Sequence, residues 1–306
     1  MPIYGQVFLG RFIGKNLIIK SYAKLNLYLK AINKRKDGFH NIETLFERIS
    51  LHDDIILKPL RDKSIKIASN DPDVPKDNSN LCYQSAKLLQ HAFNLKEGVR
   101  INIKKHIPVG AGLGGGSSNA AAALLGLNKL WGLGLDNKRL LKFAAMLGSD
   151  VPFFMHNCSF GLGTSRGEKI RPLKELDGVR LWHILAVPKI SVSTPFIYEK
   201  WDKLAKDMQL TRPKYDVNIL TLALRKNNLC LPNGLLYNSL ESVTAGLYPE
   251  VSRIKKSLID LGVKLALMSG SGPAVFGVVN SRKEAVSVTN RLEQQGNWRL
   301  FIVKTF

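Results

Sequence analysis

A glycine-rich segment, residues 108–127 with the sequence PVGAGLGGGSSNAAAALLGL, has the residue types and spacing to bind phosphate groups. Glycine adopts left-handed backbone conformations and lets a ligand approach the main chain closely. The alanine-rich stretch that follows predicts a helix, whose free N–H groups and positive dipole end would point back at the glycines. Phosphate binds at such helix N-termini, although a glycine turn without a ligand is the alternative. The candidate contacts are Pro108, Gly110, Gly112, Leu113, Gly114, Gly115, Gly116, Ser117, Ser118 and Asn119.

This loop does not fit the common nucleotide-binding motifs. Gly110, Gly112 and Gly115 have the spacing G-x-G-x-x-G, and Asp136 follows at the distance of a ribose-binding acid. Asp136, however, precedes a predicted helix and is expected to cap it, whereas the dinucleotide motif has its acid at the end of a second parallel strand. The sequence also lacks the Gly-Lys-Ser/Thr of a Walker A loop and the HRD and DFG motifs of protein kinases.

Two other segments carry polar residues at spacings that suit a binding site. The sequence SYAKLNL at 21–27 predicts a strand, in which Lys24 and Asn26 share one face because they are two residues apart. The sequence MSGSGPAVF at 268–276 predicts a second glycine turn between two strands. For Lys24 alone, a solvent-exposed strand lysine is the alternative interpretation.

Alternating apolar and polar residues predict the strands that would hold these segments. In the first half of the chain the pattern covers residues 17–22, 25–30, 46–50, 54–59 and 99–105. In the second half it covers residues 182–187, 264–268, 275–279 and 298–303. The second glycine turn therefore joins two neighbouring strands.

Helices are predicted between these strands. Behind the glycine loop, apolar residues recur at i, i+3, i+4 and i+7, which is typical of a buried helix. Gly148 and Gly262 each follow a predicted helix and are expected as C′ glycines. The order of elements in the second half is typical of a ferredoxin-like layer, so we expect an α+β fold with a domain boundary near residue 175. The other predicted helices cover residues 81–93, 137–147, 249–261 and 281–295.

Composition favours a globular protein, with 45% hydrophobic and 23% charged residues. We expect no membrane span and no secretory signal, a plastid-type transit remnant being the alternative for the basic N-terminal stretch. Cys82, Cys158 and Cys230 form no CxxC pair, which suits a reducing cytoplasm. The net charge of +21 attracts nucleic acids and small anionic substrates alike. Because the basic residues are dispersed and no nucleic-acid-binding motif is present, we expect no specific nucleic-acid partner.

The three motifs, in their order and separation, resemble those of the GHMP kinases, the superfamily of galacto-, homoserine, mevalonate and phosphomevalonate kinases, over nearly the whole chain. Four further segments are similar to the members that phosphorylate 4-diphosphocytidyl-2-C-methyl-D-erythritol: KDGFHNIETLF at 36–46, GSDVPFF at 148–154, RGE at 166–168 and STP at 193–195. The resemblance implies a two-domain α+β GHMP kinase fold. An N-terminal ribosomal-S5-like domain, residues 1–175, and a C-terminal ferredoxin-like domain, residues 176–306, would have the active site in the cleft between them.

The resemblance further implies transfer of the ATP γ-phosphoryl group to the 2-hydroxyl of that substrate, in the non-mevalonate isoprenoid pathway. Asp150 would accept the hydroxyl proton, and Lys24 would stabilise the developing negative charge. Capping of a helix is the alternative for Asp150. Asn80 would lie against the nucleotide or cap a helix. No acidic residue of the motifs is an obvious Mg²⁺ ligand, so Ser118 is the candidate.

At the cytidine end, the resemblance implies that Phe39 and Tyr198 sandwich the base and that His40 recognises its edge; for His40, an ordinary turn histidine is the alternative. Phe39 replaces the tyrosine common in the family, which keeps the aromatic face and loses the hydroxyl. Ser239 stands where the family has aspartate, and residues before Ser21 have no expected role. The remaining candidate substrate contacts are Asn26, Thr194, Pro195, Gly270, Ser271 and Gly272.

Two other functions stay open from the sequence. One is another GHMP alcohol kinase, of the homoserine or mevalonate type, and the other is a basic nucleic-acid-binding protein without catalysis. The resemblance implies ATP and Mg²⁺ as cofactors, a cytidine diphosphate-linked polyol as the small-molecule substrate, no membrane partner and a cytoplasmic monomer or homodimer.

Overall fold

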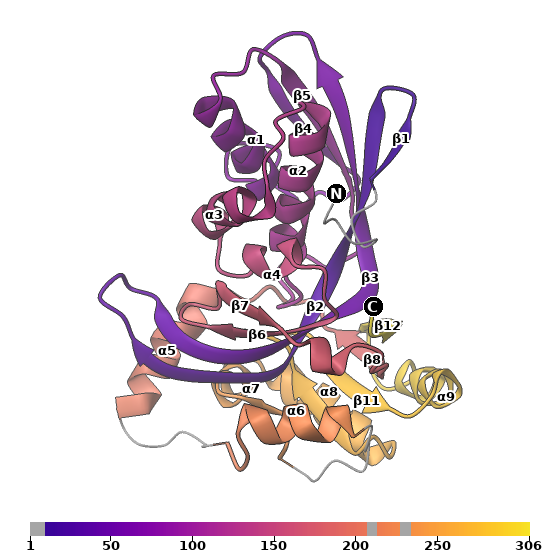
Figure 1. Ribbon diagram of the computed structural model, residues 1–306. Coiled ribbons are helices and arrows are strands. Elements are labelled where there is room, and N and C mark those ends of the chain that lie inside the picture. The colour runs from indigo at the N-terminus through magenta and orange to yellow at the C-terminus, as the bar shows by residue number, and fades with distance from the viewer. Residues whose placement is uncertain (1–9, 207–212, 227–233) are drawn as a thin grey trace. The chain divides into compact units, whose positions relative to one another are not determined.

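The computed structural model describes residues 10–206, 213–226 and 234–306, which form two compact units that interleave along the chain (Figure 1). Two long strands, β2 (Asn16–Lys34) and β3 (His40–Leu60), contribute residues to both units. The sequence predicts a single domain boundary near residue 175. The division into an N-terminal domain, residues 1–175, and a C-terminal domain, residues 176–306, stays a prediction. Unit 1 contains the described residues up to Ala23, Leu51–Val109 and Gly114–Asn157, and unit 2 contains Lys24–Ser50, Gly110–Leu113 and Cys158–Phe306.

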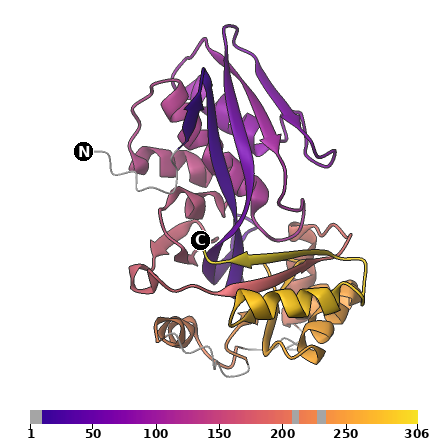
Figure 2. The ribbon, with the colours of Figure 1, turned by 90° about the vertical axis from the view of Figure 1, so that its right-hand side faces the viewer.

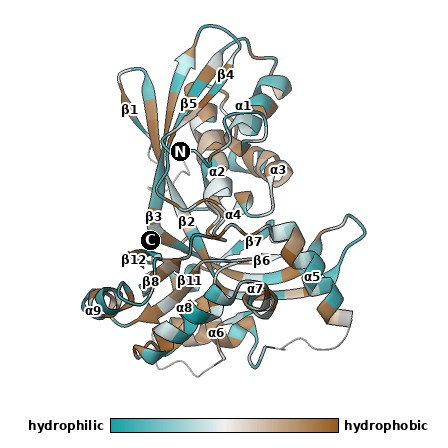
Figure 3. Cartoon of the chain, turned by 180° about the vertical axis from the view of Figure 1, so that it is seen from behind, coloured by the Kyte–Doolittle hydropathy of each residue, from teal (hydrophilic) through white to brown (hydrophobic). Residues whose placement is uncertain are grey.

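Unit 1 is a sheet covered by helices. Its strands follow the order β1-β2-β3-β5-β4, and Figure 3 shows alternating hydrophilic and hydrophobic bands along β4 and β5. β4 runs parallel to β5, a pairing that needs a crossover connection, which α1 supplies. The further elements of this unit are β1 (Arg11–Ile13), β4 (Ile65–Ser69), α1 (Leu81–Ala92), β5 (Gly98–Lys104), α2 (Gly115–Leu130), α3 (Asn137–Leu147) and α4 (Val151–Met155).

Helix α2 is the central helix of unit 1, and small residues let it approach the sheet closely. Ala120–Ala123 are fully buried. A Cβ atom on Gly126 would lie 2.5 Å from a methyl carbon of Ile19 and 2.5 Å from one of Leu57, so only glycine permits this approach. The close packing of α2 on β2 and β3 fixes the position of its N-terminus, where the glycine loop ends.

Unit 2 contains an antiparallel four-stranded sheet with the order β10-β11-β8-β12. Helices α8 and α9 pack on this sheet, as the orange and yellow helices in Figure 2 show. The strand order and the alternation of strands and helices are those of a ferredoxin-like layer, which confirms the prediction for the second half of the chain. The elements are β8 (Trp182–Val187), α8 (Pro249–Asp260), β10 (Leu265–Met268), β11 (Val275–Val279), α9 (Arg282–Leu292) and β12 (Arg299–Lys304).

Several elements of unit 2, three short strands among them, had not been predicted. β6 pairs with β3 and β7, and β9 pairs in parallel with β2. They are short, and in β6 two glycines interrupt the alternating pattern. These elements are β6 (Phe160–Thr164), β7 (Lys169–Pro172), a 3₁₀ turn (Lys174–Leu176), α5 (Thr194–Lys206), α6 (Val217–Arg225), β9 (Tyr237–Asn238) and α7 (Glu241–Leu247).

The predicted helix ends are confirmed in part. Asp136 caps α3 and accepts a hydrogen bond of 2.8 Å from the Arg139 N–H group, so it is not a ribose-binding acid. Gly262 has φ +92° and serves as a left-handed C′ glycine after α8. The same prediction for Gly148 is wrong, because its φ of 170° is extended backbone, which leads directly into α4.

Cys82 and Cys158 are buried free thiols. Burial raises the pKa of Cys82 to about 12 and that of Cys158 to about 11, so both stay protonated and unreactive near neutral pH. Cys230 lies outside the described residues. Among residues 10–206, 213–226 and 234–306, no helix is long and apolar enough to cross a membrane.

Candidate functional site

The glycine loop has the backbone conformation that its composition predicts. Gly110, Gly112 and Gly114 have φ values of +65°, +75° and +68°, in the left-handed region that favours glycine. Gly114 is the N-cap of α2, makes no side-chain cap bond, and no acidic residue lies in the first turn. The positive end of α2 is therefore not neutralised by its own first turn and suits an anion.

Ser21 of β2 connects this first turn to the sheet. Its buried hydroxyl lies 2.7 Å from Oγ of Ser118 and 2.7 Å from Oδ1 of Asn119. A hydroxyl has one proton and an amide oxygen only accepts, so Ser21 donates to Asn119 and Ser118 donates to Ser21. The lone pairs of the Ser118 oxygen then stay available to a cation, which agrees with its candidacy as a magnesium ligand.

A buried ion pair below the loop was missed by the sequence analysis. Lys105 Nζ lies 2.7 Å from Oδ2 of Asp53, whose other oxygen accepts the N–H groups of His106 and Ile107. Burial lowers the pKa of Lys105, and the charge of Asp53 opposes that effect. A Cβ atom on Gly115 would lie 3.0 Å from Lys105 Nζ, so the ammonium lies directly against the start of α2. Neither partner belongs to a recognised motif, which is why the pair was not expected.

Helix capping was the alternative role for both Asn80 and Asp150, and the structure shows it only for Asn80. Asn80 caps α1, since its side-chain oxygen accepts the Cys82 N–H at 2.8 Å and its amide nitrogen donates to the Pro75 carbonyl at 2.7 Å. Its contact with nucleotide stays a prediction. Asp150 precedes α4, but its side chain makes no capping hydrogen bond, so capping does not account for this carboxylate.

Lys24 of β2, in unit 2, is buried with 3% of its surface exposed, so the solvent-exposed alternative is wrong. Its backbone N–H donates to the Leu113 carbonyl at 3.0 Å, next to the glycine loop. Its Nζ donates to Oδ1 of Asn26 at 2.5 Å and lies 5.6 Å from the ring centre of Phe46. Lys24 and Asn26 therefore share one face of the strand, as their spacing predicts.

The orientation of Asn26 is fixed by Thr44, a residue without an expected role. The Asn26 amide nitrogen donates to Oγ1 of Thr44 at 2.8 Å, and this hydroxyl donates to the Tyr28 carbonyl at 2.7 Å. Because the amide nitrogen faces Thr44, the Asn26 oxygen must face Lys24. Thr44 therefore helps to position the Lys24 ammonium.

The second glycine turn packs against Lys24. A Cβ atom on Gly270, whose φ is +58°, would lie 3.2 Å from Lys24 Nζ and 3.4 Å from the Asn26 oxygen. The Ser269 hydroxyl donates to the Gly112 carbonyl at 3.1 Å, and a Cβ atom on Gly112 would lie 2.2 Å from the Ser269 carbonyl. Glycine at both positions is what lets the two turns meet within unit 2.

Asn238, which the sequence analysis gave no role, holds this second turn. Its amide nitrogen donates to the carbonyls of Met268 and Gly270, both at 2.8 Å. The neighbouring Ser239 accepts the Ala31 N–H at 3.0 Å, so a hydroxyl oxygen serves where the family has an aspartate. Thr194, the first residue of α5, lies with its hydroxyl 2.7 Å from that of Ser271, while Pro195 is exposed.

The candidate cytidine contacts form one cation–π contact and one pair of stacked rings. Phe39 is 49% exposed, and the Arg166 guanidinium lies 4.7 Å from its ring centre. His40 stacks on Tyr198 with ring centres 4.6 Å apart and planes at 22°. His40 is buried and is the first residue of β3. A sandwich of Phe39 and Tyr198 around a base stays a prediction.

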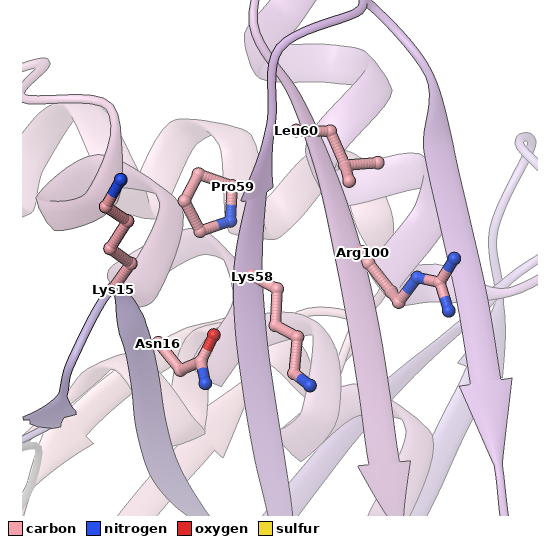
Figure 4. A pocket seen from close by; sticks show the side chains of 6 residues that line it. All are labelled: Lys15, Asn16, Lys58, Pro59, Leu60 and Arg100. Atoms are coloured by element: carbon pink, nitrogen blue, oxygen red, sulfur yellow. The ribbon is translucent and has the colours of Figure 1, made fainter.

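A pocket of about 400 Å³ on unit 1 contains none of the predicted site residues. Figure 4 shows its lining, in which Lys58 and Arg100 stand opposite each other on neighbouring strands. The residues that line this pocket are Lys15, Asn16, Lys58, Pro59, Leu60 and Arg100.

Within the described part of the chain, no group of three or more His, Cys, Asp or Glu side chains could hold a metal ion.

Comparison with known proteins identifies relatives of the whole chain. The model of the GHMP kinases N terminal domain matches residues 80–158, and that of the GHMP kinases C terminal matches residues 220–297. A 4-diphosphocytidyl-2-C-methyl-D-erythritol kinase of Geobacillus sp. (strain WCH70) is 43% identical over 281 residues, covering 90% of this chain and 92% of the relative. A kinase of the same name from Listeria innocua is 42% identical, covering 90% and 91%.

A solved structure agrees with these sequence relatives. The crystal structure of a 4-(cytidine 5'-diphospho)-2C-methyl-D-erythritol kinase matches with a TM-score of 0.76 and 31% identity. The match covers 94% of this chain and 98% of the solved chain, so both halves of the fold are included.

Proposed function

This chain belongs to the GHMP kinases, and we propose that it transfers the γ-phosphoryl group of ATP to the 2-hydroxyl of 4-diphosphocytidyl-2-C-methyl-D-erythritol, in the non-mevalonate route to isoprenoid precursors. The observation that carries the proposal is the buried Lys24, whose ammonium lies against the second glycine turn and whose backbone N–H donates to the Leu113 carbonyl in the first. Relatives with 43% identity bear the name of this kinase, which favours it over homoserine and mevalonate kinases.

Phosphoryl transfer needs positioning and charge stabilisation more than covalent help from the protein. We assign the phosphates of ATP to the N-terminus of α2, whose left-handed glycines expose the main-chain N–H groups. Asp150 accepts the proton of the attacking hydroxyl, and Lys24 stabilises the negative charge that develops on oxygen.

Magnesium is the expected metal, and the residues at the start of α2 fit it. Mg²⁺ prefers oxygen ligands and keeps several waters, so one protein hydroxyl with phosphate oxygens suffices. Ser118 offers oxygen lone pairs because its proton goes to Ser21. When bound, the metal neutralises charge on the transferring phosphates.

The substrate that accepts the phosphoryl group binds at polar groups of unit 2. Asn26, Thr194 and the turn at residues 270–272 contact the substrate, and His40 with its aromatic neighbours binds the cytosine. We place the reaction in the cytoplasm and the enzyme as a monomer or homodimer, with no specific nucleic-acid partner.

A substrate panel tests this proposal. The purified protein with ATP and Mg²⁺ should release ADP with 4-diphosphocytidyl-2-C-methyl-D-erythritol and only at background level with homoserine or mevalonate. Phosphorus NMR should show a new phosphomonoester at the 2-position. Equal or faster turnover of homoserine or mevalonate would contradict the assignment of the substrate.

Replacing Gly115 with valine should weaken ATP binding by about tenfold or more, because the added side chain would press on the buried Ile107 and Lys105 and shift the main-chain N–H groups at the start of α2. The KM for ATP, or calorimetry with a non-hydrolysable analogue, measures the effect. Gly246→Ala in α7 is the control, since a Cβ there meets nothing within 4 Å. Unchanged ATP affinity in Gly115→Val would remove α2 from the phosphate site.

A further inference from the structure

We propose that Asp202 is a positioning residue that fixes the proton of His40 and thereby makes the substrate site selective for cytosine over uracil. The inference rests on the proposed function, in which His40 contacts the base. It concerns a carboxylate outside every recognised motif of this chain.

One face of helix α5 holds the His40 ring. Tyr198, Trp201 and Asp202 are spaced i, i+3 and i+4, so they line the same side of the helix. Tyr198 stacks on the ring face, and Trp201 meets it edge-on with ring centres 5.6 Å apart and planes at 89°. Oδ1 of Asp202 lies 2.6 Å from Nε2 of His40. The imidazole, 7% exposed, is therefore held by three side chains of a single helix.

Asp202 is an ionised carboxylate and can only accept hydrogen bonds. Burial alone would raise its pKa, but hydrogen bonds from Lys34 and His40 hold that pKa below the usual value. Its second oxygen lies 2.7 Å from Lys34 Nζ. Because the carboxylate only accepts, Nε2 of His40 must carry the proton that lies between them.

The other ring nitrogen is then an acceptor in the neutral imidazole. No residue that the structure describes donates to or accepts from Nδ1 of His40. Cytosine carries an exocyclic amino donor at the position where uracil carries a carbonyl oxygen. A lone pair on Nδ1 matches the amino group and opposes the carbonyl, so the fixed proton rejects uracil as well as accepting cytosine. Without Asp202, the ring could move its proton to Nδ1 and donate to uracil.

Asp202→Asn separates this role from simple packing. The amide has the same size but can donate or accept, so it supports either tautomer of His40. We expect the ratio of kcat/KM for the cytidine substrate to that for its uracil analogue to fall about tenfold. The ratio should fall because the KM for the cytidine substrate rises, while kcat and the KM for ATP stay nearly unchanged.

Two control variants remove neighbouring charges and keep the hydrogen bond between the Asp202 carboxylate and His40. Lys34→Met breaks the ion pair with Asp202, and Glu199→Gln removes an exposed carboxylate of α5 that pairs with Lys203. Both should keep the cytosine preference of the wild type. Loss of that preference in either control would assign it to the surrounding charge and overturn the role of Asp202.

NMR of ¹⁵N-histidine-labelled protein reads the tautomer without turnover, with the His40 signals assigned from their absence in His40→Gln. We expect the Nε2–H form in the wild type and a mixture of tautomers in Asp202→Asn. An Nδ1–H form or an imidazolium in the wild type at the assay pH would overturn the inference. So would an unchanged base preference in Asp202→Asn with an active wild type. A wild type inactive on the cytidine substrate would instead refute the proposed function, and this inference with it.

Discussion

Replacing Asp150 with asparagine should lower kcat by about 10²-fold or more, because the amide cannot accept the proton of the attacking hydroxyl. The folded state should be little affected, since asparagine has the same size as aspartate and keeps a hydrogen-bonding side chain. ATP affinity should also stay near the wild-type value. Steady-state kinetics with both substrates, together with thermal unfolding, measure these quantities.

Asp136→Asn is the matched control for this variant. It makes the same change from carboxylate to amide at another helix start of unit 1, where the side chain does cap. Asparagine caps helices about as well as aspartate, so both stability and kcat should stay close to the wild type. Turnover at the wild-type rate in Asp150→Asn would show that Asp150 is not the base.

Replacing Lys24 with methionine should lower kcat by about 10² to 10³-fold, the effect of removing one group that stabilises transition-state charge. Methionine fills similar volume, so the buried site keeps its packing while losing the ammonium. Asn26 loses its partner for Oδ1, which adds a modest cost in stability. Rapid-quench measurement of the phosphoryl-transfer step separates this effect from product release.

Lys20→Met is the control on the same strand, because Lys20 is exposed. It should leave kcat unchanged. The double variant Asp150→Asn, Lys24→Met tests whether the two groups serve one step. When two residues act together, the loss of kcat in the double variant is far smaller than the product of the losses in the single variants. Fully multiplicative losses would indicate independent roles, and a nearly normal kcat in Lys24→Met would contradict the assignment of Lys24.

The sequence predicted those parts of the site that depend on local patterns. Left-handed backbone at Gly110 and Gly112 followed from glycine content, and the shared face of Lys24 and Asn26 followed from their spacing. The ferredoxin-like order followed from alternating elements. The first two depend on neighbouring residues, and the third depends on the order of elements that are each recognised from a short local pattern.

The parts that were missed depend on residues far apart in the chain. Asn238 holds the glycine turn through bonds to Met268 and Gly270, and Asp53 meets Lys105 across neighbouring strands. No local pattern specifies such partners, because tertiary packing selects them. Asp202 was missed for the same reason: helix α5 had not been predicted, and nothing in the sequence indicated that His40 lay against this carboxylate.

The interleaving of the two units limits how this enzyme can be taken apart or recombined. The chain enters and leaves each unit more than once, through β2, β3 and the short segment Gly110–Leu113. A fragment ending near residue 175 would retain Lys24–Ser50 while lacking most of the residues these strands pack with in unit 2. Grafting one contiguous C-terminal piece between relatives would therefore leave the recipient's Lys24–Ser50 in place, so the hybrid would combine parts of unit 2 from two different proteins.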